Sequence, residues 1–313
     1  MALTDKNKVQ ESTFKGRIKD DILLGPEYPV HRDSVNVAET ILKTLKSKPD
    51  CIGQNLDAII VLLGIMYING KCNTWDHELS LTTARYFLSL TSPKLIFTIP
   101  LSAVSLTKAA KELKMDVKIV VLGKLDGYES VDDILKGHDS REVAEFKCTP
   151  ISNPDEVGLI VLSSGTTGMP KATEISHTSI HNRMLPVKVA EMKGHVCMFT
   201  PALRWLYGVR LAFKTILACS TRIVVPDCDR IIAPDGVTDD NECDMYCKFI
   251  EKYQVTWFCT DPFILVQMIK TDILEKFRLS SLKVIITSGS IFQNQYQETL
   301  RKKLPQIGRA HYY

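Results

Sequence analysis

The residues between 163 and 171 combine hydroxyl side chains, two glycines and a lysine in a pattern that suits phosphate binding. The run reads Ser163, Ser164, Gly165, Thr166, Thr167, Gly168, Met169, Pro170 and Lys171. Glycines let the backbone approach a bulky anion, and hydroxyl and backbone N–H groups can donate hydrogen bonds to it. The lysine brings a positive charge to the β- or γ-phosphate. The pattern therefore predicts a phosphate-binding loop at the end of the apolar strand 157–162.

The same composition also fits a hydroxyl-rich surface loop that closes a hairpin, because short Ser/Thr/Gly loops are common. The run is not a Walker A loop, since Met169, Pro170 and Lys171 follow Gly168 where that motif has Lys and then Ser or Thr. From composition alone, both interpretations stay open.

Residues 162–180 read LSSGTTGMPKATEISHTSI and closely resemble the AMP-binding signature of the adenylate-forming superfamily. The resemblance continues past the loop into Ile-Ser-His and the next helix, and it is nearest to the insect luciferase-like and 4-coumarate–CoA ligase-like branch. In that superfamily a carboxylic acid attacks the α-phosphate of ATP to form an acyl-adenylate, and a thiol such as coenzyme A then displaces AMP. The resemblance implies an acid–thiol ligase that uses ATP, Mg²⁺ and coenzyme A. The implied phosphate-binding residues are Ser163, Ser164, Gly165, Thr166, Thr167, Gly168 and Lys171.

Further segments are similar to the family in a looser way. Residues 203–208 match a substrate-pocket motif, with Trp205, Tyr207 and Gly208 as pocket residues. Trp205 stands where many relatives have a histidine; an indole cannot carry a proton as imidazole does, but it can line an apolar pocket or pack in the core. Residues 73–76 resemble a strand end of the fold.

A glycine-containing strand end beside the adenine is also expected. Ser288, Gly289 and Ser290 match it, although Ser290 and Ile291 replace the small pair that is usual there. Among the histidines, His177 has a structural counterpart in the family, whereas His77 and His181 lack the spacing of a catalytic triad. Among nine cysteines, Cys243 and Cys247 are four apart without a second zinc-like pair.

Several family residues have no match in these 313 residues. Tyr312 or Tyr313 corresponds to the first residue of a Tyr-Gly-x-Thr-Glu element whose Glu binds Mg²⁺. That Glu, a ribose-binding Asp, a hinge Arg and the Lys of a small C-terminal domain are unmatched, and the Gln54–Asn55 junction resembles the loss of a supersecondary unit. We therefore expect a truncated and catalytically incomplete chain. The alternatives are a non-catalytic nucleotide-binding isoform and a non-functional fragment.

Alternating helical and strand patterns predict an α/β fold with parallel sheets flanked by helices, as in an incomplete N-terminal (AMP-binding) domain of the acyl-CoA synthetase fold. We expect an N-terminal segment at 1–54, a subdomain with the phosphate loop at 55–225 and a second subdomain at 226–313. The expected strands are 94–99, 117–122, 157–162, 197–200, 222–225, 255–259 and 284–287. The expected helices are 37–48, 57–68, 80–90, 105–114, 209–218, 242–252, 264–274 and 294–303.

Composition limits the partners. A formal net charge of +3 gives no reason to expect a nucleic-acid partner. The apolar run 56–68 is too short to span a bilayer and predicts a buried helix rather than a transmembrane segment. An odd cysteine count and a polar N-terminus favour a reducing, cytoplasmic location, with a peroxisomal one left open for a longer form.

Overall fold

The computed structural model describes residues 17–19, 22–24, 37–47, 57–76, 78–136, 140–163, 168–184, 192–224 and 240–312. The chain divides into two compact units, Met1–Ser34 and Val35–Tyr313. In the first, two short strands pair in antiparallel fashion, β1 (Arg17–Lys19) and β2 (Ile22–Leu24). All elements below belong to the second unit.

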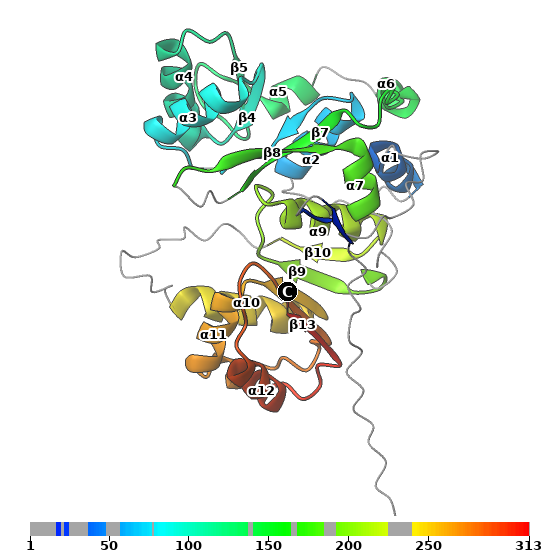
Figure 1. The fold of residues 1–313 in the computed structure, drawn as a ribbon, viewed down its shortest axis with the longest axis vertical. Coiled ribbons are helices and arrows are strands. Elements are labelled where there is room, and N and C mark those ends of the chain that lie inside the picture. The colour runs from blue at the N-terminus through cyan, green and yellow to red at the C-terminus, as the bar shows by residue number, and fades with distance from the viewer. Residues whose placement is uncertain are drawn as a thin grey trace, which may run out of the picture. The chain divides into compact units, whose positions relative to one another are not determined.

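A five-stranded parallel sheet has the order β10-β9-β11-β12-β13. Figure 1 shows β9 and β10 side by side within it. Its strands are β9 (Val196–Phe199), β10 (Thr221–Ile223), β11 (Trp257–Thr260), β12 (Val284–Thr287) and β13 (Arg309–Tyr312). Every residue of the central strand β11 is buried, as the interior of a parallel sheet requires. All five strands run the same way, so their carboxyl ends lie along one edge.

Helices connect the consecutive strands of this sheet, because parallel neighbours need a crossover. Asp261 caps one of them by accepting a hydrogen bond from the Ile264 N–H at 3.1 Å, with Pro262 at its first position. The connecting helices are α9 (Leu206–Leu217), α10 (Asp240–Tyr253), α11 (Pro262–Lys270) with the 3-10 turn η3 (Ile273–Glu275), and α12 (Asn294–Lys303).

A three-stranded sheet carries the predicted phosphate loop, and it contains one antiparallel pair beside a parallel one. Strand β7 (Val157–Ser163) runs parallel to β3 (Cys72–Asn73) but antiparallel to β8 (Lys171–Ser176). Figure 1 shows β7 and β8 as a long paired ribbon. Residues 164–170 are too few for a crossover, which takes about a dozen, so the chain returns as a hairpin.

A second three-stranded sheet, in the order β4-β5-β6, is parallel. Its strands are β4 (Leu95–Thr98), β5 (Lys118–Val121) and β6 (Glu129–Ser130), and its helices are α3 (Leu81–Thr91) and α4 (Pro100–Glu112). Helix α4 begins at Pro100 rather than at the expected residue 105, because proline's fixed φ suits the first helical position.

The other expected strands lie within two residues of their observed ends, and helix 294–303 is observed as α12. In the polar stretch 126–155, where no element was expected, β6 is followed by α5 (Val131–Leu135) and α6 (Ser140–Glu145). The remaining helices are α1 (Val37–Ser47), α2 (Asp57–Tyr67) and α7 (His177–Met184).

Three clusters of buried apolar side chains hold these elements together. The first joins β7 to β9 and β11, with Leu159, Phe199 and Cys259 among its members, and helix α9 contributes Phe213. The second lies under α10, α11 and α12, and the third between α3, α4 and Leu162. The expected division at residue 225 falls between β10 and β11, and the five-stranded sheet has strands from both sides of it.

Candidate functional site

The predicted phosphate loop lies at the carboxyl end of β7, where the hairpin turns. Ser163 is the last residue of β7 and pairs with Lys171, the first of β8. The Ser163 hydroxyl donates to the Lys171 carbonyl at 3.4 Å, which is a long hydrogen bond that leaves the hydroxyl accessible to a ligand. Both side chains are exposed. Ser164, Gly165, Thr166 and Thr167 lie outside the described residues, so their phosphate-binding role stays a prediction.

The returning arm of the hairpin, residues 168–170, leads into β8 and needs a glycine at position 168. The φ of Gly168 is +119°, in the region that L side chains rarely adopt, and nothing lies within 4 Å of the position of a Cβ. The antiparallel pairing of β7 and β8 forms a hairpin. Phosphate binding is compatible with this hairpin, because Gly168 and Lys171 are exposed.

Tyr86 of α3 holds the returning arm from outside the hairpin. Its hydroxyl donates to the carbonyl of Pro170 at 2.6 Å, across 84 positions of sequence. Sequence reasoning did not identify this contact, and no local signal marks it, because it depends on how α3 packs against the sheet.

The carboxyl edge of the five-stranded sheet gathers a second set of polar groups. The Thr200 and Thr260 hydroxyls, at the ends of β9 and β11, share a hydrogen bond of 3.0 Å. Thr287, the last residue of β12, is fully buried and its hydroxyl has no partner among the described residues. Tyr312 ends β13 in register with Thr287.

The predicted adenine-side residues follow Thr287 at this edge. Ser288 is half-buried, whereas Gly289 and Ser290 are exposed. Gly289 has φ +105°, so a glycine is required where the chain leaves the sheet. Ile291 is 90% exposed, which leaves its side chain free of the core.

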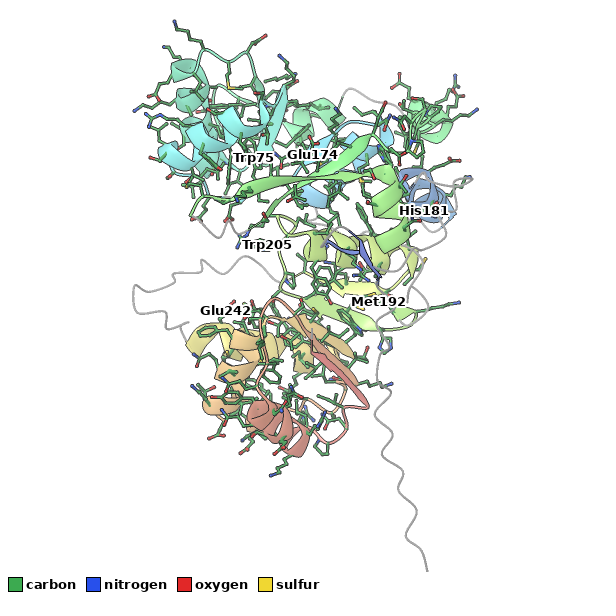
Figure 2. The ribbon with its side chains drawn as sticks, in the orientation of Figure 1. Trp75, Glu174, His181, Met192, Trp205 and Glu242 are labelled. Carbon is green, nitrogen blue, oxygen red and sulfur yellow. The ribbon has the colours of Figure 1, made fainter. Side chains whose placement is uncertain are left out.

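The predicted substrate-pocket residues lie in the first turn of α9, after β9. Trp205 is the N-cap of the helix and is 39% exposed, so its ring is not packed in the core (Figure 2). Tyr207 packs against the first core cluster, and its side chain hydrogen-bonds the Cys259 thiol. A Cβ on Gly208 would lie 2.1 Å from the Ala202 carbonyl oxygen, so this position admits glycine alone.

An ion pair links residues 73–76 to residues 203–208. Arg204 Nη1 lies 2.7 Å from Asp76 Oδ1, joining the segment after β3 to the segment before α9 across 128 positions. The Arg204 guanidinium also lies over the Trp205 ring, 5.6 Å from its centroid. Figure 2 labels Trp75, which precedes Asp76, and Trp205, which follows Arg204. The sequence resemblance identified residues 73–76 and 203–208 as separate segments, but it did not predict the ion pair between them.

His177 has the structural place expected for it. Its ring is buried against Gly158, where a Cβ would come within 2.6 Å of the ring. Burial lowers its pKa, and the nearby Glu156 only partly opposes that shift. His181 is half-buried on α7, and His77 lies outside the described residues.

Cysteines and acidic residues do not assemble a metal site in the described part of the chain. Cys243 and Cys247 are both buried in the second core cluster, and burial raises the pKa of the Cys247 thiol to about 12. Both thiols thus serve the core of α10. Among the described residues, no helix has the length and apolarity to cross a bilayer.

Comparison with known proteins identifies the family of this chain. A family model described as AMP-binding enzyme matches residues 51–313. The chain is 24% identical over 159 residues to 4-coumarate-CoA ligase 1 of Narcissus pseudonarcissus, covering 49% of this chain and 27% of that protein. It is 23% identical over 226 residues to luciferin 4-monooxygenase of Nipponoluciola cruciata, covering 69% and 39%.

Among solved structures, the luciferase-like enzyme from the nonluminescent Zophobas morio mealworm has a TM-score of 0.68 at 22% identity. The match covers 94% of this chain and 66% of that one, and it shows a shared fold. The chain spans less than half the length of the two curated relatives. Because the family model covers most of the sequence, the chain belongs to the AMP-binding enzyme family.

Proposed function

We propose that this chain binds ATP through the loop Ser163–Lys171 and is the nucleotide-binding part of an enzyme that activates a carboxylic acid as its adenylate and transfers it to coenzyme A. The observation that carries the proposal is the hairpin end of β7 and β8, where Ser163, Gly168 and Lys171 are exposed at the carboxyl end of a buried strand. The resemblance to ligase and luciferase sequences around this loop supports it.

Each group has a defined part in this proposal. The hydroxyl and backbone N–H groups of the loop hold the phosphates, and the Lys171 ammonium neutralises charge on the outer ones. The adenine lies beside Ser288, Gly289 and Ser290. The carboxylic acid lies beside Trp205, Tyr207 and Gly208, where an exposed indole favours an apolar acid.

We expect Mg²⁺ to bind together with the nucleotide, through its phosphate oxygens, rather than at a separate protein site. The described residues hold no group of three ligands that would bind the ion by themselves. Mg²⁺ commonly binds through phosphate oxygens with few protein ligands, and there it neutralises developing charge. The chain's own residues would then act on the phosphates directly.

Replacing Lys171 tests the proposal. We expect Lys171→Ala to raise the Kd for Mg-ATP about tenfold or more, because a hydrogen bond to a charged group contributes about 1.5–3 kcal/mol. The Kd for AMP should change much less, since AMP lacks the outer phosphates. Isothermal titration calorimetry measures both. Lys118→Ala, which removes an exposed lysine paired with Glu129 on β6, is the matched control. Equal losses for ATP and AMP would contradict the assigned role.

A second candidate is a non-catalytic nucleotide-binding protein. The observation that favours it is Trp205, which cannot transfer a proton and is exposed where many relatives have a histidine. Exchange of pyrophosphate into ATP, measured with a panel of fatty and aryl acids, separates the two. Acid-dependent exchange supports the ligase, and ATP binding without exchange supports the second candidate.

A further inference from the structure

The Tyr86 hydroxyl is placed to control the position of Lys171. It donates to the Pro170 carbonyl at 2.6 Å, and that carbonyl belongs to the peptide unit that leads into Lys171. Pro170 has no N–H, so this carbonyl is the one backbone hydrogen-bonding group that it can offer. The bond is much shorter than the 3.4 Å contact between the Ser163 hydroxyl and the Lys171 carbonyl.

Helix α3 provides a rigid base for this hydroxyl. Ser80 caps the helix by accepting a hydrogen bond from the Thr83 N–H at 3.1 Å. On the next turn Phe87 is buried in the third core cluster, which also includes Leu162 of β7. Helix and hairpin are therefore parts of one packed core.

Aromatic contacts restrict the Tyr86 ring itself. Its centroid lies 5.8 Å from that of Phe87, whose ring lies 5.4 Å from Trp75. Tyr86 is half-buried and packs against the third core cluster, and its hydroxyl reaches the hairpin. A hydroxyl held in this way is pre-organised to fix its acceptor.

We propose that Tyr86 is a positioning residue for the phosphate loop, holding the Pro170–Lys171 peptide so that the lysine charge meets the outer phosphates of ATP. The inference rests on the proposed function of the loop. In this role Tyr86 does not contact the nucleotide. Its hydroxyl acts through the backbone that carries Lys171.

Tyr86→Phe in the full chain tests this assignment. The substitution removes one hydroxyl and keeps the ring. We expect the Kd for Mg-ATP to rise about threefold to tenfold, the range that corresponds to one hydrogen bond. The Kd for AMP should change less than about twofold. Tyr128→Phe is the matched control, because the Tyr128 hydroxyl shares a 2.7 Å hydrogen bond with Thr107 of α4 rather than with Pro170.

A double-mutant cycle distinguishes positioning from general stability. If Tyr86 acts through Lys171, Tyr86→Phe should cause no further loss of ATP affinity once Lys171 is alanine. Losses that add fully would overturn the inference. The inference would also be overturned if Tyr86→Phe left the ATP affinity unchanged while Lys171→Ala weakened ATP binding selectively. That result would leave the proposed function intact. Equal effects of Lys171→Ala on ATP and AMP would instead remove the proposed function and the inference with it.

Hydrogen exchange gives a readout that does not depend on nucleotide binding. In Tyr86→Phe, the backbone amides of Gly168, Met169 and Lys171 should exchange about threefold to tenfold faster than in the wild type and in Tyr128→Phe. Unchanged exchange at these three amides would show that the hydroxyl does not hold the arm, and would overturn the inference.

Discussion

Gly208 and Gly64 differ in how closely other atoms approach the position of a Cβ. Gly208, in the first turn of α9, passes so close to the preceding segment that a Cβ would lie 2.1 Å from the Ala202 carbonyl oxygen and 2.6 Å from that of Pro201. Gly64, in the middle of α2, has nothing within 4 Å of the same position. One glycine is required by packing beside the candidate substrate pocket, and the other is only a weak helix former.

Alanine at the two positions should therefore have opposite effects on stability. We expect Gly208→Ala to lower the free energy of unfolding by about 1–3 kcal/mol or more, because the contact is with backbone that cannot move aside cheaply. Gly64→Ala should raise it by about 0.5–1 kcal/mol, since alanine is the better helix former. Denaturant titration followed by circular dichroism measures both. A Gly208→Ala protein as stable as the wild type would show that α9 can shift away from Ala202.

At the scale of elements, strand β3 is short but carries an unusual set of buried polar atoms. It lies at the edge of the three-stranded sheet, with β7 on one side. The Asn73 amide, the Thr74 hydroxyl and the Trp75 indole N–H are buried and have no hydrogen-bond partner among the described residues. Such groups are rare in native proteins, because each loses its hydration without compensation. These atoms lie at the carboxyl end of β3, next to the Asp76–Arg204 ion pair.

Removing one of these groups should leave the free energy of unfolding unchanged or raise it. Asn73→Leu keeps the approximate shape and removes both orphaned amide atoms, so we expect the free energy of unfolding to stay the same or rise by about 1 kcal/mol. The contrasting variant is Ser102→Ala. Its fully buried hydroxyl accepts from the Leu79 N–H at 2.9 Å, and its loss should lower stability by about 1–3 kcal/mol. If Asn73→Leu proves as destabilising as Ser102→Ala, the amide has a partner such as an ordered water.

At the scale of the whole second unit, strands and cores cross the division expected at residue 225. Strands β9 and β10 precede that residue, and β11 to β13 follow it in the same sheet. The first core cluster likewise joins Leu159 of β7 to Phe213 of α9 and Trp257 of β11. The sheet and the first core cluster therefore contain residues from both sides of residue 225.

We therefore expect residues 35–313 to unfold in one transition. Trp75 lies against the third core cluster and Trp257 in the first. Because the chain has three tryptophans, Trp75→Phe and Trp257→Phe in a Trp205→Phe background each leave a single tryptophan that reports on one region by fluorescence. Both denaturation curves should coincide with far-UV circular dichroism. Phe213→Ala, in the fully buried middle of α9, should lower stability by about 3–5 kcal/mol in every signal. Separate midpoints for the two tryptophans would show independent subdomains.

Local properties of the sequence were enough to predict the α/β fold, most strands and the position of the loop at the end of β7. Apolar runs such as 157–162 and the spacing of Gly165 and Gly168 are local signals, and the family resemblance rests on the same contiguous residues. The tertiary structure alone decided that Tyr86 holds Pro170 and that Arg204 pairs with Asp76. These contacts join residues far apart in the chain. They exist only because α3, β3 and α9 pack around common cores, and no pattern within a short window records that packing.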